Sequence, residues 1–323
     1  MRVVVIGGSG HIGTFLVPRL VRAGHEVVSI TRGTSRAYAE APEWQHVEHV
    51  VADRQAEDAA GTFAGRVADL RPEAVIDLVC FTLESAAALV EGLRGTSAHL
   101  VNCGSIWRSG RSAIVPTTEE TMTPPFDEYG IEKQRIAEML KAETAAGGLD
   151  TTSLHPGHIV GPGWEPINPL GNVDLAVWQT LAAGRPLPVP GLGAETVHHV
   201  HADDVAQAFE LAITNRDRAA GEDFNITSAA ALSVRGFAHA SASWFGQEAH
   251  LKHVTWDEFR QATTAEHADK SLEHLDRSPC FSIDKAKSLL GYAPSYSSLD
   301  AVRESVAWLI DSGALAVERP LAR

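Results

Sequence analysis

Short apolar runs alternate with longer amphipathic stretches through the first half of the chain. The apolar runs cover residues 3–6, 27–30, 47–53, 74–79, 99–102 and 151–155. Helical spacing recurs at Ile12, Leu16 and Leu20, in the stretch that ends at Leu70, and over residues 84–93 and 128–147. Strands that alternate with helices in this way indicate βαβ units, whose right-handed crossovers produce a parallel sheet covered on both faces. The pattern therefore predicts an α/β fold with a doubly wound parallel sheet.

The pattern changes after residue 156. The stretch 155–172 reads HPGHIVGPGWEPINPLGN and is dense in proline and glycine, which predicts a long loop over a site rather than a sheet strand. Helical periodicity returns over residues 202–213, with Asp203 as the expected N-cap, and again over 302–310. We expect a larger domain over residues 1–160 and a smaller one over 161–323, with some elements of the second returning to the sheet.

Composition narrows the classes of function. The formal net charge is −14 over 323 residues, which disfavours a nucleic-acid partner because such proteins usually present a basic face. The three cysteines, Cys80, Cys103 and Cys280, form no C-x-x-C pair, which favours a reducing compartment over a disulfide framework. No apolar run is long enough for a signal sequence or a membrane span. We expect a cytoplasmic protein that does not enter the membrane.

A glycine-rich loop joins the first strand to the first helix. VVVIGGSGHIG places Gly7, Gly10 and Gly13 at this junction, and Gly8, Gly10 and Gly13 also satisfy G-x-G-x-x-G. Such glycines allow a tight turn, close approach to a pyrophosphate and tight helix packing, while the helix N-terminus attracts the anion. The motif is weak alone, but its position between a strand and a helix supports dinucleotide binding. The residues expected to contact the cofactor here are Gly7, Gly10, His11, Ile12 and Gly13.

The end of the second strand bears on which dinucleotide binds. An acidic residue there would bind the ribose 2′-hydroxyl of NAD, whereas this chain has Thr31 and Arg32, with Arg36 close behind. A guanidinium matches a 2′-phosphate in charge and geometry, so NADP is favoured and NAD remains an alternative. Asp53, after the third strand, could accept a hydrogen bond from the adenine amino group or could cap a helix.

Tyr129 and Lys133 are candidates for proton transfer. In PFDEYGIEKQRIAEML they are four residues apart, so a helix would place both side chains on one face. A neighbouring ammonium group favours the phenolate, so we expect the pKa of Tyr129 to fall toward neutrality. Tyr129 could then donate a proton to a carbonyl or remove one from a hydroxyl. This pair gains weight from its place after the glycine loop and the fifth strand.

Taken in order, these blocks resemble the extended short-chain dehydrogenase/reductase family, in its NAD-dependent epimerase/dehydratase branch. The matching stretches, within roughly residues 1 to 240, are GGSGHIG, VAD at 51–53, YGIEK at 129–133, HPGHIVGP at 155–162 and VHADDVAQAF at 200–209. The resemblance implies a Rossmann domain that binds a nicotinamide cofactor and a C-terminal substrate domain. It implies that Tyr129 is the acid/base, that Lys133 holds the nicotinamide ribose, and that the Pro156-Gly157 turn passes beside the nicotinamide. It also implies a homodimer formed through the tyrosine-bearing helix.

The chain departs from this family where a hydroxyl is expected. Members usually have Ser or Thr four residues before an aromatic, and counting back from Trp107 that place holds Cys103. A thiol is a weak hydrogen-bond donor, so Cys103 would replace the hydroxyl poorly. Ser105 lies two residues later, and we favour it, after a small shift of register, as the group that polarises the reacting oxygen. The alternative is that Tyr129 works with less help.

Other residues bear on the substrate. The dehydratase branch has Thr-Asp-Glu where this chain has Cys-Gly-Ser, which disfavours dehydration, and His155 and His158 replace residues usual in nucleotide-sugar members. His155, His158, Trp107 and Trp164 are candidates for substrate contact, although structural roles are equally compatible with the sequence. His198, His199 and His201 lie close together, but without another ligand nearby we do not expect a metal.

Three functions are compatible with these features. We favour an NADP-preferring oxidoreductase or epimerase that acts on a secondary alcohol or ketone of a small polar or sugar-like substrate. The missing hydroxyl at the fifth strand would also suit a non-catalytic NADP-sensing module with a protein partner. An RNA-binding role, as in atypical relatives, is disfavoured by the acidic charge.

Overall fold

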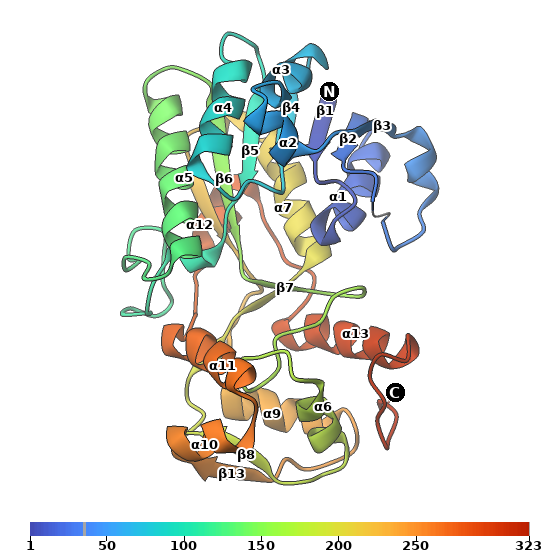
Figure 1. Ribbon diagram of the computed structural model, residues 1–323, viewed down its shortest axis with the longest axis vertical. Coiled ribbons are helices and arrows are strands. Elements are labelled where there is room, and N and C mark those ends of the chain that lie inside the picture. The colour runs from blue at the N-terminus through green and yellow to red at the C-terminus, as the bar shows by residue number, and fades with distance from the viewer. Residues whose placement is uncertain (35–36, 323) are drawn as a thin grey trace.

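The computed structural model describes residues 1–34 and 37–322. Its centre is a parallel sheet of seven strands in the order β3-β2-β1-β4-β5-β6-β11 (Figure 1). The strands are β1 (Arg2–Ile6), β2 (Glu26–Thr31), β3 (Glu48–Val51), β4 (Ala74–Asp77), β5 (His99–Cys103), β6 (Asp150–Pro156) and β11 (Asp223–Ile226). The doubly wound parallel sheet predicted from the sequence is confirmed.

Helices cover both faces of the sheet because alternate residues of its strands point to opposite sides. In β1, Val3 and Val5 pack into the core beneath one set of helices, and Val4 and Ile6 into the core beneath the other. The first set is α1 (His11–Arg22), α7 (Ala202–Thr214), α8 (Arg216–Ala219) and α12 (Asp284–Leu290). The second set is α3 (Phe63–Asp69), α4 (Leu83–Leu93) and α5 (Glu128–Ala145), with α2 (Arg54–Ala59) beside α3. β1, which is buried on both faces, thus reads as a continuous apolar run in the sequence.

A smaller group of elements lies below the sheet in Figure 1 and has its own apolar core, which includes Trp178 and Phe237. Its helices are α6 (Leu175–Ala182), α9 (Val234–Ser243), α10 (Trp256–Ala262), α11 (Ala265–Arg277) and α13 (Ser298–Asp311). Its strand pairs are β7 (His158–Val160) with β10 (His199–His201), β8 (Leu187–Pro190) with β13 (Leu251–Val254), and β9 (Thr196–Val197) with β12 (Leu232–Ser233). Short 3₁₀ turns at Pro42–His46 and Ile106–Arg108 complete the elements. β11 comes from the second half of the chain yet forms an edge strand of the sheet, and α7 and α12, from the same half, pack on one face of it. The domain boundary at residue 160 stays a prediction.

Several element ends differ from the sequence-based expectation. β4 ends at Asp77 rather than at residue 79, because the Asp77 carboxylate accepts a hydrogen bond from the Val79 N–H at 3.1 Å and turns the chain out of the sheet. The helical stretch before Leu70 is divided into α2 and α3 around Gly61, whose φ is +68°. The N-cap of α7 is His201, not Asp203, because the His201 imidazole accepts from the Asp203 N–H at 3.0 Å.

The proline-rich stretch after residue 156 is not entirely loop. Residues 158–160 form β7, which pairs with β10 outside the main sheet. The expectation of a loop was wrong for these three residues, because a partner distant in sequence satisfies their backbone groups. No helix within the described ranges is both long and apolar enough to cross a membrane.

Candidate active site

The glycine loop lies where the strand order reverses, since β1 pairs with β2 on one side and β4 on the other. Gly7 has a φ of +88°, a conformation that favours glycine. A Cβ at Gly13 would lie 2.3 Å from the Gly8 carbonyl oxygen, so helix and loop pack too closely for a side chain. Gly10 caps α1 without a side-chain hydrogen bond, which leaves first-turn N–H groups for an anion. These features fit a pyrophosphate at this loop.

Two adjoining cavities open along this edge of the sheet. One has a volume of about 920 Å³ and the other about 750 Å³, and both are lined by Gly7, Gly10, Val79 and Phe81. Of the predicted cofactor residues, Thr31, Arg32 and Asp53 line the first cavity. The second is lined by His11, Ile12, Gly13, Lys133, Pro156 and Gly157. The two cavities together give an extended ligand a continuous course past the glycine loop.

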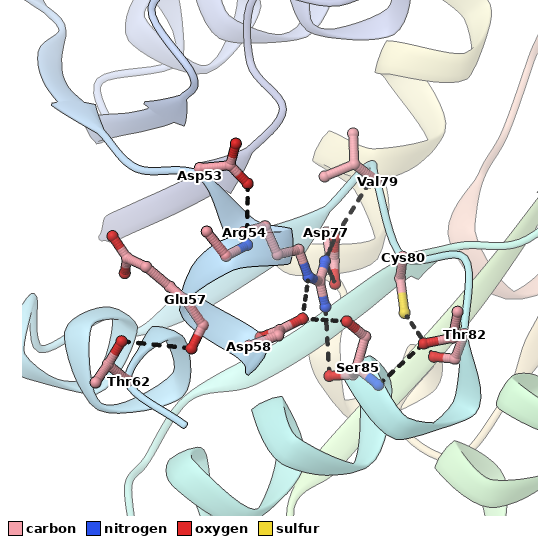
Figure 2. A network of polar contacts seen from close by, with 11 residues as sticks. Asp53, Arg54, Glu57, Asp58, Thr62, Asp77, Val79, Cys80, Thr82 and Ser85 are labelled. Carbon is pink, nitrogen blue, oxygen red and sulfur yellow. Dashed lines mark hydrogen bonds and ion pairs between the residues drawn. The ribbon is translucent and has the colours of Figure 1, made fainter. Parts of the chain in front are cut away.

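The first cavity has an acidic and basic network in its wall (Figure 2). Arg54 donates to both carboxylate oxygens of Asp77 at 2.6 Å and to Asp58 at 3.3 Å. Burial would lower the pKa of Arg54, but the charges around it and its hydrogen bonds, with Asp77 the largest contributor, together outweigh burial and raise that pKa above its ordinary value. The sequence patterns did not single out this pair, although a lone acidic residue inside an apolar run was a usable signal.

Asp53 and Arg32 border the same cavity in different ways. Asp53 caps α2, accepting from the Ala56 N–H at 3.1 Å, so the helix-cap alternative is observed. Arg32 is exposed, and no acidic side chain in the described ranges pairs with it. Because Arg54 is engaged by Asp77 and Asp58, Arg32 is the cation that remains available to a ligand among the described residues of this wall. Arg36 lies outside the described residues.

Tyr129 and Lys133 both line the second cavity, as their helical spacing predicts. Lys133 is only 2 % exposed, and its ammonium group donates to the carbonyl oxygens of Cys80 at 2.7 Å and Cys103 at 2.9 Å. These contacts hold the lysine between the ends of β4 and β5. Its nitrogen lies 5.6 Å from the centre of the Tyr129 ring.

The pKa of Tyr129 differs from the sequence-based expectation. Tyr129 is 42 % exposed, but its partial burial, reinforced by the neighbouring Cys103, raises its pKa to about 12. Only the Ser105 side chain opposes this shift among the larger influences. The expectation that Lys133 would bring it toward neutrality was wrong for this structure, because the ammonium group is directed to two backbone carbonyls. Tyr129 is therefore a neutral phenol at pH 7, able to donate a proton.

Ser105 and Cys103 both reach the second cavity but face different surroundings. The Ser105 hydroxyl oxygen accepts from the Trp107 N–H at 3.2 Å, and this side chain also interacts with Tyr129. The Cys103 thiol donates toward the Gly104 carbonyl at 3.8 Å, and burial raises its pKa to about 11. Of the two, the serine side chain lowers the pKa of Tyr129, whereas Cys103 raises it. Their catalytic roles stay predictions.

The substrate candidates divide into three that line the cavity and one that does not. Trp107, His158 and Trp164 line it, and Trp164 is 50 % exposed. His155 is fully buried and accepts from the Ser105 N–H at 3.2 Å, so it supports the loop from behind and is outside the cavity lining. Burial holds the pKa of His158 well below 6.5, and neither ring nitrogen has a hydrogen-bond partner among the described residues.

The helix α11 forms one side of this second cavity. None of its residues was a candidate from the sequence. His267, Lys270, Glu273 and His274 line it, together with Asn172. The ring of His274 lies 5.1 Å from Trp107 and 4.9 Å from His158. Nothing in the local sequence marks α11, because its neighbours in the cavity come from distant parts of the chain.

The neighbouring histidines 198, 199 and 201 make separate structural contacts. His198 bonds the Ser228 carbonyl at 2.9 Å and accepts from the Phe281 N–H at 3.1 Å. His199 bonds the Ile167 carbonyl at 3.0 Å, and His201 contacts Glu304 at 3.1 Å. Each of the three side chains therefore connects β10, or the residue just before it, to a different segment. The three rings do not converge on one position.

The sequence profile of the NAD dependent epimerase/dehydratase family matches residues 3–227. The chain belongs to this family. The match covers the sheet, the glycine loop, Tyr129 and Lys133, and so agrees with the cavities described above. The family is NAD-dependent, and the close glycine packing at the loop would suit such a dinucleotide.

Three similar proteins carry different activities in their names. A 2'-dehydrokanamycin reductase from Streptomyces kanamyceticus is 34% identical over 68% of this chain, and the match spans 60% of that relative's length. The chloroplast stem-loop binding protein of 41 kDa b from Arabidopsis thaliana is 27% identical over 94% of this chain and 78% of its own. A UDP-glucose 4-epimerase from Thermotoga maritima, solved with UDP-glucose, aligns with a TM-score of 0.69 and 19% identity over 97% of this chain and 99% of its own. The similar proteins thus differ in the activity that their names give, and the last comparison supports the fold alone.

Proposed function

We propose that this protein is an NADP-preferring oxidoreductase or epimerase that acts on a secondary alcohol or ketone of a small polar or sugar-like substrate. The observation that carries the proposal is the shared position of Tyr129 and Lys133 in the cavity that adjoins the glycine loop. The reductase and UDP-glucose 4-epimerase names of proteins similar in sequence support this chemistry. The region from residue 161 onward, with α11, would supply the substrate-binding side.

In this proposal Tyr129, Ser105 and Lys133 have separate roles. Tyr129, a neutral phenol, donates a proton to the substrate oxygen in reduction and takes it back in oxidation. Ser105 donates to the same oxygen and polarises it. Lys133, anchored by two carbonyls, has a third N–H to offer to the ribose of the cofactor. The nicotinamide, when bound, supplies hydride transfer.

The decisive experiment replaces Tyr129 with Phe. We expect turnover to fall by about two to four orders of magnitude, since positioned proton transfer contributes that much. Affinity for NADPH, measured by titration calorimetry, should stay close to that of the parent. Reduction would consume NADPH stoichiometrically, whereas epimerisation would not, so the same assay distinguishes them. Full activity in the variant would rule out Tyr129 as the acid/base.

The cofactor preference rests on Arg32. Replacing Arg32 with Ser should weaken NADPH binding by at least about tenfold, because a charge-assisted hydrogen bond to the 2′-phosphate is lost, and should leave NADH affinity nearly unchanged. Arg66 is a suitable control, since it pairs with Glu57 on the same domain and does not line the first cavity. Equal losses for both cofactors would contradict the assignment of Arg32 to the 2′-phosphate.

Two alternatives make different predictions. A non-catalytic NADP sensor would bind cofactor without turnover on any carbonyl panel, and its affinity for a partner would follow the NADP redox state. The stem-loop-binding relative brings an RNA-binding alternative, which the net charge of −14 opposes. Retention of a stem-loop RNA at physiological salt would favour that alternative.

A further inference from the structure

Arg277, the last residue of α11, is buried between two aromatic rings near the N-terminus of α5. It is only 3 % exposed. The centre of its guanidinium lies 3.9 Å from the centre of the Trp107 ring and 4.1 Å from that of Phe126. A cation within about 6 Å of a ring face is attracted by the ring, and more strongly when water is excluded. Arg277 therefore fixes the orientation of Trp107, which lines the second cavity.

The same guanidinium forms an ion pair with Asp127. Asp127 is the N-cap of α5, and its other carboxylate oxygen accepts from the Gly130 N–H at 2.9 Å. Tyr129 is the second residue of this helix. Arg277 thus connects α11 to the start of the helix that carries Tyr129 and Lys133.

These two contacts meet at Tyr129. The Trp107 ring lies 6.4 Å from the Tyr129 ring and 5.1 Å from that of His274, in edge-on arrangements. Because Arg277 holds both Trp107 and Asp127, a movement of α11 would shift the cavity wall and the acid/base helix together. The sequence separates Arg277 from Asp127 by 150 residues, so only the fold brings them into contact.

We propose that Arg277 is a positioning residue for Tyr129, acting through Trp107 and Asp127. This inference rests on the proposed function of Tyr129. Its second effect is on charge: the Asp127 carboxylate raises the pKa of Tyr129, and Arg277 neutralises it. Among the described residues, the other groups that face Tyr129 are Lys133 from its own helix, Cys103 and Ser105 from the end of β5, and, across Trp107, His274 from α11.

The test compares Arg277→Met with Arg111→Met. Arg111 is a matched control because it also pairs with an acidic residue of α11, Asp276, and lies 4.6 Å from the Phe126 ring. Its side chain is 62% exposed, however, and it contacts neither Trp107 nor Asp127. Arg277→Met should lower kcat about tenfold to a hundredfold, as expected for a displaced catalytic group, whereas Arg111→Met should leave kcat unchanged.

The pH profile separates positioning from plain loss of stability. In Arg277→Met the Asp127 carboxylate loses its partner and raises the pKa of Tyr129 further, so the basic limb of the kcat/KM profile should move to higher pH. Adding Asp127→Asn removes that carboxylate and should move the limb back without restoring kcat. Arg277→Lys keeps the positive charge but cannot stack flat on the two rings, so it should restore the pH profile of kcat/KM more fully than it restores kcat. If Arg277→Met does not fold, Arg277→Lys provides the same comparison. A lower Tm with parental kcat and pH profile would overturn the inference.

A readout without turnover keeps the two proposals distinguishable. Crystal structures of Arg277→Met and Arg111→Met with bound NADP should show Trp107 and Tyr129 displaced only in the first. Parental positions of both rings in Arg277→Met would overturn the inference. If the parent shows no turnover on any substrate, the proposed function fails, while the positions of these two rings still test the coupling.

Discussion

At the scale of single residues, the end of β5 presents two candidate groups whose chemistry differs. Cys103 occupies the position where the family resemblance leads us to expect a hydroxyl, but its thiol is turned toward the Gly104 carbonyl and its raised pKa keeps it protonated. Ser105 lies two residues later and interacts with Tyr129. The 3₁₀ turn that begins after Ser105 brings its hydroxyl back to the cavity, which explains how the role could pass to this residue.

Replacing Ser105 with Ala should therefore lower kcat by about a hundredfold, as losing one preorganised donor to a reacting oxygen does in other enzymes. Cys103→Ala is the matched variant, since it removes a neighbouring buried side chain of similar size. We expect it to change kcat by less than about threefold, because a thiol is a weak donor. Steady-state kinetics on the same substrate compare the two variants. The opposite order of effects would assign the role to Cys103.

At the scale of elements, the junction of β1 and α1 joins packing to ligand binding. Glycines at 7, 10 and 13 allow the helix to start directly above the strand, and each meets a different constraint. At Gly13 an added Cβ would meet the Gly8 backbone at 2.3 Å, whereas at Gly10 the nearest atom, the Gly7 carbonyl oxygen, would be 3.3 Å away. The helix N-terminus can approach an anion only while this packing persists.

Gly13→Ala should consequently lower the free energy of unfolding by about 1–3 kcal/mol, the usual cost of overpacking a tight interface, and abolish NADPH binding. Gly10→Ala should be clearly milder in stability, because a shift of a few tenths of an ångström relieves its contact. Urea unfolding and calorimetric titration of both variants provide the comparison. Parental stability in Gly13→Ala would contradict the close packing of α1 on the loop.

Sequence patterns are not sufficient to predict the residue at which a strand ends. The apolar run 74–79 gave no sign that Asp77 would end β4, because that ending depends on a carboxylate that also binds Arg54 from α2. Likewise, residues 158–160 form a strand only because β10 lies beside them. Apolar periodicity records which face is buried, whereas an element's end depends on partners supplied by other segments.

At the scale of the whole molecule, buried neutral histidines make the fold sensitive to acid. His198 and His199 have no exposed surface, and burial lowers the pKa of His198 to about 4 and that of His199 to about 3. Both lie on the segment that connects the smaller group of elements to the sheet. In the unfolded chain their pKa returns to about 6.5, so the unfolded state binds more protons between pH 6.5 and 4.

The free energy of unfolding should therefore fall as the pH drops below 6.5. With about 1.4 kcal/mol for each pKa unit, each of these two histidines contributes a loss of roughly 2 kcal/mol by pH 5. Urea unfolding at pH 7.5 and pH 5 measures the difference, and His199→Phe should reduce it. The exposed His250, replaced with Gln, is the control and should leave it unchanged. Equal free energies at the two pH values would contradict this account.

The sequence by itself determined the sheet, the glycine loop and the spacing of Tyr129 and Lys133, because these depend on local patterns: buried runs, glycines at fixed intervals and one helical turn. Only the tertiary structure decided that α11 closes the second cavity, that Arg277 contacts Asp127, and that the pKa of Tyr129 is raised. Those properties arise from distant segments meeting and from burial. A pKa depends on what surrounds a group in space, and no local spacing records that.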